Sequence, residues 1–131
     1  MDAETFSALC RGLFLEPSDF TEQFDVEVEQ VIRWAEAGDP PIAVMQWLLE
    51  LTILAEELYD SSLDDLVDED EDLELEELPL IELARFASAE AYKAARPDEI
   101  MPWSSHTGVV SRLAVTLTAM GYPVEVTSIE S

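Results

Sequence analysis

Apolar residues recur along most of the chain every three to four positions, the spacing of an amphipathic helix. In the N-terminal part, this spacing predicts three short helices, over about Ala3–Leu13, Pro17–Phe24 and Val28–Ala37. Pro17 suits a first helical turn, because the N–H that proline lacks has no helical partner there. Gly38 is expected to end the third helix, and a turn of Asp39 and two prolines follows.

Longer apolar stretches follow this turn. A fourth helix is predicted from Pro41 to about Tyr59, and because it is apolar nearly all round we expect it to be central. A fifth helix is predicted over about Pro79–Ala95, before Pro97. Ser104 or Ser105 could cap a last helix that runs to about Met120 and is closed by Gly121. The alternation of Val124 and Val126 is compatible with one short strand over Pro123–Thr127. The expected fold is therefore all-α, with at most this one terminal strand.

The net charge of the chain limits the classes of partner that it is expected to bind. Among 131 residues, 30 are Asp or Glu and only 6 are Lys or Arg, which gives a net charge of −24. Phosphates would be repelled, so we expect no direct binding to nucleic acid or to an anionic membrane surface. The same charge favours a basic partner.

The acids are concentrated in the middle of the chain. Residues 56–77 hold thirteen acids and no base, whereas residues 1–55 carry a net charge of −9 and residues 78–131 one of −2. We therefore divide the chain into a domain over residues 1–60, an acidic linker or insertion over residues 61–78, and a C-terminal region over residues 79–131. The centre of the block is an acidic run and a candidate acidic patch: Asp68, Glu69, Asp70, Glu71 and Asp72. Like charges repel, so local mobility is expected there.

Residues 17–36 have the pattern of a helix-turn-helix unit. Such a unit needs apolar residues where two short helices cross, a small residue in the first helix and a tight turn between them. The apolar positions are Phe20, Phe24, Val26, Val31 and Trp34. Thr21 takes the small position, and Asp25 takes the turn, where its side chain tolerates a left-handed backbone better than most. Two adjacent amphipathic helices without this role remain the alternative.

The stretch from Phe6 to Leu49 resembles the Cro/CI-like helix-turn-helix domains of bacteria and phages. Within these domains it looks most similar to the small anti-CRISPR-associated repressors and their uncharacterised bacterial relatives. The residues that carry this closer resemblance are Arg33-Trp34, Gly38, Pro41, Arg85-Phe86, Tyr92, Pro97, Trp103, Val109–Leu117 and Gly121. The resemblance implies an N-terminal four-helix domain, C-terminal helices that form a homodimer, and a DNA-binding autoregulator.

By the matched positions, the outward side of the second helix of the unit is a recognition face made of Glu27, Val28, Glu29, Ile32 and Arg33. Reading bases and holding phosphates requires Arg, Lys, Asn or Gln, and among these residues only Arg33 qualifies. Val28 and Ile32 lie four residues apart and form an apolar pair instead, which is typical of a protein contact. Two incidental exposed aliphatic residues remain the alternative.

Two functions therefore stay open. The first is a regulatory or inhibitory binding protein that acts by protein contact, with its acids imitating phosphates if the partner is a basic nucleic-acid enzyme. Its partner could equally be a related DNA-binding protein. The second is a DNA-binding transcriptional repressor of the helix-turn-helix family.

Other kinds of site find little support in the sequence. His106 is the only histidine, and we expect it at a helix start or as a hydrogen-bond donor in the core. Cys10, the only cysteine, and Trp47 and Trp103 are expected in the core. No nucleophile and base are paired, and the acidic run lacks the glycine and final acid of a calcium loop. We expect no enzyme activity, cofactor or metal site, and, without a signal peptide or membrane span, a cytoplasmic protein.

Overall fold

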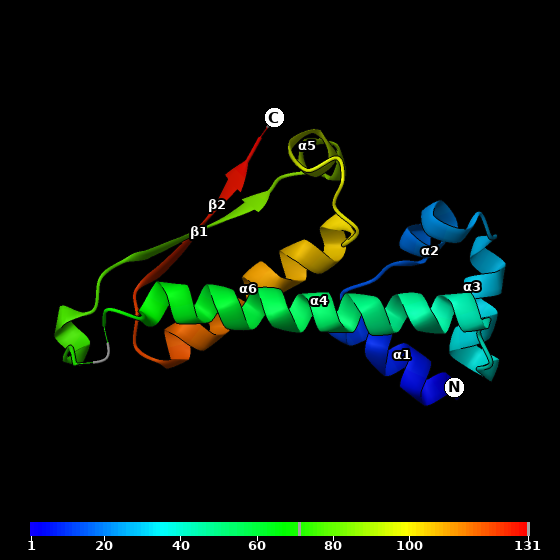
Figure 1. The fold of residues 1–131 in the computed structure, drawn as a ribbon, viewed down its shortest axis with the longest axis horizontal. Coiled ribbons are helices and arrows are strands. Elements are labelled where there is room, and N and C mark those ends of the chain that lie inside the picture. The colour runs from blue at the N-terminus through cyan, green and yellow to red at the C-terminus, as the bar shows by residue number, and fades with distance from the viewer. Residues whose placement is uncertain (71, 131) are drawn as a thin grey trace. The chain divides into compact units, whose positions relative to one another are not determined.

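In the computed structural model, which describes residues 1–70 and 72–130, the chain divides into two compact units. The N-terminal unit covers Met1–Leu54 and the C-terminal unit covers Ala55–Ser131. The described residues form six α-helices, one short 3-10 helix and two strands, so the fold is mainly helical. One helix, α4 (Ile42–Val67), contributes residues to both units (Figure 1).

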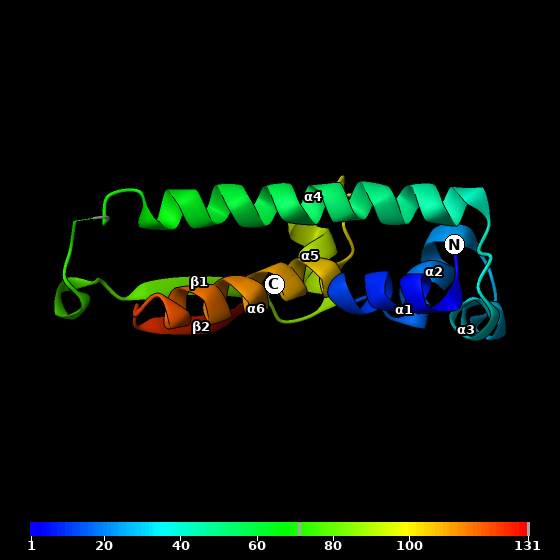
Figure 2. The same ribbon diagram turned by 90° about the horizontal axis from the view of Figure 1, so that it is seen from below.

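Three short helices open the N-terminal unit, as the apolar spacing predicted. They are α1 (Ala3–Gly12), α2 (Pro17–Phe24) and α3 (Val28–Ala37). The Asp2 side chain caps α1 by accepting a hydrogen bond from the Thr5 amide at 2.7 Å, and this bond lowers the pKa of Asp2. Both α1 and α2 pack against α3 (Figure 2).

Two residues with positive φ angles end α2 and α3. Asp25 follows α2 with φ 54° and ψ 43°, the left-handed conformation that its place in the turn predicted. Gly38 ends α3 with φ 81°, and a Cβ atom there would lie 2.9 Å from the Ala3 amide nitrogen. A side chain at residue 38 would therefore collide with the start of α1, in addition to the strain of a positive φ.

An aromatic cluster holds these helices together. Phe6 of α1, Phe20 of α2, Trp34 of α3 and Trp47 of α4 are all at most 5% exposed. The ring centroids of Phe20 and Trp34 are 6.2 Å apart, and those of Phe20 and Trp47 are 5.2 Å apart, both edge to face. Such pairs add about 0.5–1.5 kcal/mol each beyond the burial of their surface.

The fourth helix differs from the prediction in length and in burial. It continues eight residues beyond the predicted end at Tyr59, because the first turns of the acidic block still place Leu63, Leu66 and Val67 at helical spacing. It is also not buried all round. Within the N-terminal unit, an exposed stripe runs along it, made of Ile42, Leu49 and Ile53.

The C-terminal unit contains a two-stranded parallel sheet, which corrects the all-α prediction. Strand β1 (Ile81–Phe86) pairs with β2 (Val124–Ile129), in a register that places Ile81 opposite Val124 and Phe86 opposite Ile129 (Figure 1). The predicted strand over Pro123–Thr127 is thus confirmed as part of β2. The predicted helix over Pro79–Ala95 is wrong: it is β1 followed by the short helix α5 (Ala89–Ala95).

The error has a physical cause. In β1, Ile81 and Leu83 are buried while Glu82 between them is exposed, which is the alternation of a strand. A run of six residues is too short to distinguish the helical repeat from the alternation of a strand. The strand that pairs with it lies about forty residues further along the chain. The long-range pairing therefore decides the structure of this segment, not its local spacing.

Helix α6 (Trp103–Ala119) packs against both strands and begins earlier than predicted. Its N-cap is Pro102, so neither Ser104 nor Ser105 caps it; Ser105 is buried instead. A polar contact joins α6 to the C-terminal half of α4: Arg112 forms an ion pair with Glu56 at 2.7 Å and lies 3.8 Å over the Tyr59 ring. The Tyr59 and Thr116 hydroxyl groups are 2.6 Å apart.

A 3-10 helix, η1 (Leu75–Glu77), lies between α4 and β1 and completes the elements of the C-terminal unit. Among the helices that the structure describes, none combines the length and the apolar character needed to cross a membrane.

Candidate functional site

The recognition face lies on the solvent side of α3, at its N-terminal end. Glu27 is the N-cap of α3, and Glu29 and Arg33 are exposed on the same helix. Val28 is 43% exposed and Ile32 is 45% exposed, while their neighbours Val31 and Trp34 are buried. The five predicted residues thus lie exposed along the N-cap and first two turns of α3, with the apolar pair half open to solvent.

A groove continues this face toward α1. It is formed where α1, the start of α2 and α3 meet, has a volume of about 290 Å³, and is mostly apolar. Ile32 and Ala35 line it from α3, and Cys10 and Leu15 line it from α1 and the following loop. The sequence analysis missed this groove, because nothing in the spacing of α1 shows that Cys10 stops short of full burial.

The electrostatic surroundings of the face are acidic. Glu16 and Arg11 lie at the groove, and the N-terminal unit as a whole has eleven acids against two bases, Arg11 and Arg33. A helix N-terminus favours negative charge, so the acids at the start of α3 also stabilise the helix. The face combines apolar contact area with an excess of negative charge.

Cys10 is half-buried rather than fully in the core, which corrects its expected place. Burial raises the pKa of its thiol from 9.0 to about 11. At neutral pH the side chain is therefore a protonated, weakly reactive thiol, and it contributes apolar surface to the groove.

The acidic run belongs to the C-terminal unit and thus not to the unit that carries the recognition face. Asp68, Glu69 and Asp72 are exposed, and Glu71 lies outside the described residues. Asp70 is half-buried and accepts a hydrogen bond from the Tyr122 hydroxyl at 3.3 Å, which attaches the run to the segment before β2. Within the described ranges, no three His, Cys, Asp or Glu side chains lie close enough to hold a metal ion.

His106 lies at a helix start and in the core, as expected. It lies in the first turn of α6, is 8% exposed, and packs against the rings of Phe86 and Tyr92, whose centroids are 5.9 and 5.2 Å from its own. Its Nδ1 atom is buried and has no hydrogen-bond partner within the described residues, so it is not a satisfied core donor through that atom. Burial, together with the nearby Arg96, lowers its pKa.

Trp47 is confirmed as a core residue, whereas Trp103 is only partly buried. Trp47 is 5% exposed in the aromatic cluster. Trp103 is partly buried against Phe86 and donates its Nε1 hydrogen bond to the Phe86 carbonyl at 2.8 Å.

Comparisons with known protein families and with curated proteins found no match to this chain.

Proposed function

We propose that this chain is a regulatory or inhibitory binding protein that uses a helix-turn-helix scaffold to contact another protein. The recognition face of α3 and the groove beside it form the contact surface, and the partner is basic. The observation that carries the proposal is the half-exposed pair of Val28 and Ile32, which lies next to an apolar groove and is surrounded by acids.

The apolar pair supports a protein contact because it offers what an interface centre requires. Ile32 lies both on the face and at the groove, so one partner side chain could fill the groove while its neighbours cover Val28. Burying these two side chains and the groove would remove apolar surface from water at about 25 cal/mol per Å². Interface hot spots are typically such packed, desolvated pockets.

The charges support a basic partner. Glu27 and Glu29 stand on either side of Val28, and Glu16 borders the groove. Acids arranged around an apolar centre speed the encounter with a positively charged surface and disfavour acidic competitors. If that surface normally holds nucleic acid, the carboxylates take the places of phosphates.

A DNA-binding repressor of the helix-turn-helix family is the second candidate. Three features favour it: α2 and α3 are joined by a three-residue turn that starts with a left-handed Asp25, both helices share the core of Phe20 and Trp34, and Arg33 is exposed on α3. Against it, Glu27 and Glu29 would face phosphates, and each would cost affinity rather than provide it.

The proposal can be tested by capture of the partner from a lysate of the native host with the tagged full chain, followed by quantitative mass spectrometry. We expect a basic protein whose recovery falls as salt rises, because its encounter with the acidic surface is electrostatic. Val28→Asp and Ile32→Asp should each weaken its binding by about 1–3 kcal/mol, through the desolvation of a new charge in the contact.

Val126→Asp is the matched control, because Val126 on β2 has the same 43% exposure as Val28 but belongs to the other unit. It should leave recovery of the partner unchanged. Circular dichroism should show all three variants folded, since each replaced side chain is half-exposed. Equal recovery with all three variants would remove the recognition face from the interaction and refute the proposal.

A further inference from the structure

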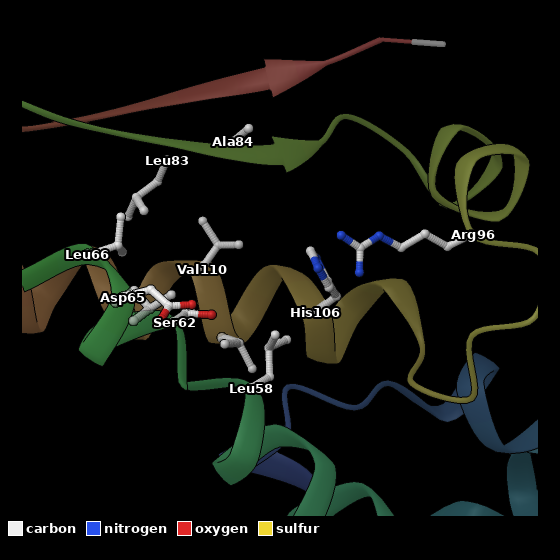
Figure 3. A pocket seen from close by; sticks show the side chains of 11 residues that line it. Leu58, Ser62, Asp65, Leu66, Leu83, Ala84, Arg96, His106 and Val110 are labelled. Carbon is white, nitrogen blue, oxygen red and sulfur yellow. The ribbon is translucent and has the colours of Figure 1, made fainter. Parts of the chain in front are cut away.

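The C-terminal unit contains an open cavity of about 340 Å³ between α4, β1 and α6. Its middle is apolar, with Leu66 of α4, Leu83 of β1 and Val110 of α6 along its walls (Figure 3). Leu113 of α6 also lines it. An apolar cavity of 150 Å³ is large enough for benzene, so this one has room for roughly twelve non-hydrogen atoms. Its volume lies at the lower end of the range for small-molecule sites.

The two ends of the cavity differ in chemistry. Arg96, which follows α5, extends its guanidinium group toward the His106 ring at one end, whereas Asp65 and Ser62 of α4 lie toward the other end (Figure 3). Arg96 is one of only six cationic side chains in a chain with thirty acids. Its placement at an apolar cavity is therefore a feature that the composition does not lead us to expect.

His106 provides the second polar group at this end. A neutral imidazole carries one N–H, and a buried N–H without an acceptor is rarer and costlier than an unused lone pair. Because Nδ1 is buried without a partner, the proton belongs on Nε2. The His106 ring lines the cavity next to the Arg96 guanidinium group, where a neutral ring with its proton on Nε2 would supply a hydrogen-bond donor.

We propose that this cavity binds a small carboxylic acid with an apolar body of about ten carbon atoms. The carboxylate lies between Arg96 and His106, and the apolar body lies along Leu66, Leu83 and Val110. Charge-assisted hydrogen bonds from a guanidinium group to a carboxylate are about twice as strong as neutral ones, so the carboxylate end sets the selectivity. Asp65 is exposed at the opposite end and disfavours a second negative charge there.

The test is calorimetric titration of the full chain with three probes of one shape: 4-phenylbutyrate, 4-phenylbutanol and 4-phenylbutylammonium. We expect saturable binding of the carboxylate, at least tenfold tighter than that of the alcohol, and no binding of the ammonium ion. If the alcohol binds as tightly as the carboxylate, or the ammonium ion binds best, the proposal is wrong. Absence of saturable binding of the carboxylate also overturns it.

Variants locate the site. Arg96→Gln should weaken 4-phenylbutyrate at least tenfold and leave 4-phenylbutanol unchanged, which separates loss of the charge contact from loss of the fold. Ala84→Leu, which adds a side chain at the cavity wall, should weaken both probes. Arg85→Gln is the matched control, since it removes the same charge from β1 at a residue that does not line the cavity, and it should change neither. Carboxylate binding that survives in both Arg96→Gln and Ala84→Leu would place the ligand elsewhere.

Discussion

Trp34 is a core residue that links α3 to α1 and α2 in the N-terminal unit. Its ring packs edge to face against both Phe6 and Phe20, with centroids 6.1 and 6.2 Å away, and it is 4% exposed. Trp34→Ala should lower the free energy of unfolding by roughly 3–5 kcal/mol, because the cavity is enclosed by two other rings that cannot collapse into it. Chemical denaturation followed by circular dichroism measures this loss. Ile32→Ala, on the same helix but half-exposed, should cost far less; equal losses would contradict the packing.

His106 predicts a pH dependence of stability. Burial lowers its pKa in the folded chain below the ordinary value of 6.5, so the unfolded chain binds the proton at the higher pH. Stability that is complete above pH 6.5 should therefore fall as the pH is lowered below it. Urea denaturation at pH 7.5 and pH 5.5 checks this for the protein and for His106→Gln. Between pH 7.5 and pH 5.5, the unsubstituted protein should lose more free energy of unfolding than His106→Gln does. Equal losses in the two proteins would show that the fold does not lower the pKa of His106.

Residue patterns predicted the N-terminal unit well because its contacts are local. Asp25, Gly38 and Pro17 each impose a backbone conformation that the sequence itself shows, and Phe20 and Trp34 recur at helical spacing. The outward position of Val28 and Ile32 on α3 followed from the same spacing. Cys10 was placed less well, since its partial burial depends on the loop after α1 and on α3.

The acidic run between α4 and η1 is expected to oppose folding more than support it. Replacing Asp68, Glu69 and Asp72 by Ser should leave the melting temperature unchanged or raise it, because it removes repulsion between exposed like charges. Asp70→Asn is a separate variant, since Asp70 accepts the Tyr122 hydrogen bond. Differential scanning calorimetry measures the melting temperature of the triple variant and, separately, that of Asp70→Asn. A clear loss of stability in the triple variant would mean that these acids hold a structural contact.

The segment over Pro79–Ala95 shows where local spacing fails as a guide. The six residues of β1 fit a helix and a strand equally well. Only pairing with β2, which follows α5 and α6 in the chain, makes this segment a strand. Parallel strands require such a long crossover, so their pairing leaves little local signal. The cavity beside β1 was invisible for the same reason, because α4, β1 and α6 meet only in the folded unit.

Dimerisation of the chain remains a prediction from the sequence. The resemblance on which it rests includes the stretch Val109–Leu117, in which Val109, Val110, Leu113 and Leu117 are buried within the C-terminal unit, while Val115 is 71% exposed. Light scattering at micromolar concentration should give the mass of a dimer. The dimer fraction should increase with salt, because two chains of charge −24 repel each other less when screened. A monomer mass at every salt concentration would exclude the dimer.

We propose that this chain uses a helix-turn-helix scaffold to contact protein and not DNA. This is tested by a mobility-shift titration of the purified protein against DNA duplexes from the region upstream of its gene. The titration is done at about 50 mM salt, where phosphate contacts are strongest. We predict no shift of the DNA band, because the N-terminal unit has eleven acidic residues and only two basic ones. Sequence-specific binding that disappears with Arg33→Ala would contradict the account and identify the protein as a DNA-binding repressor.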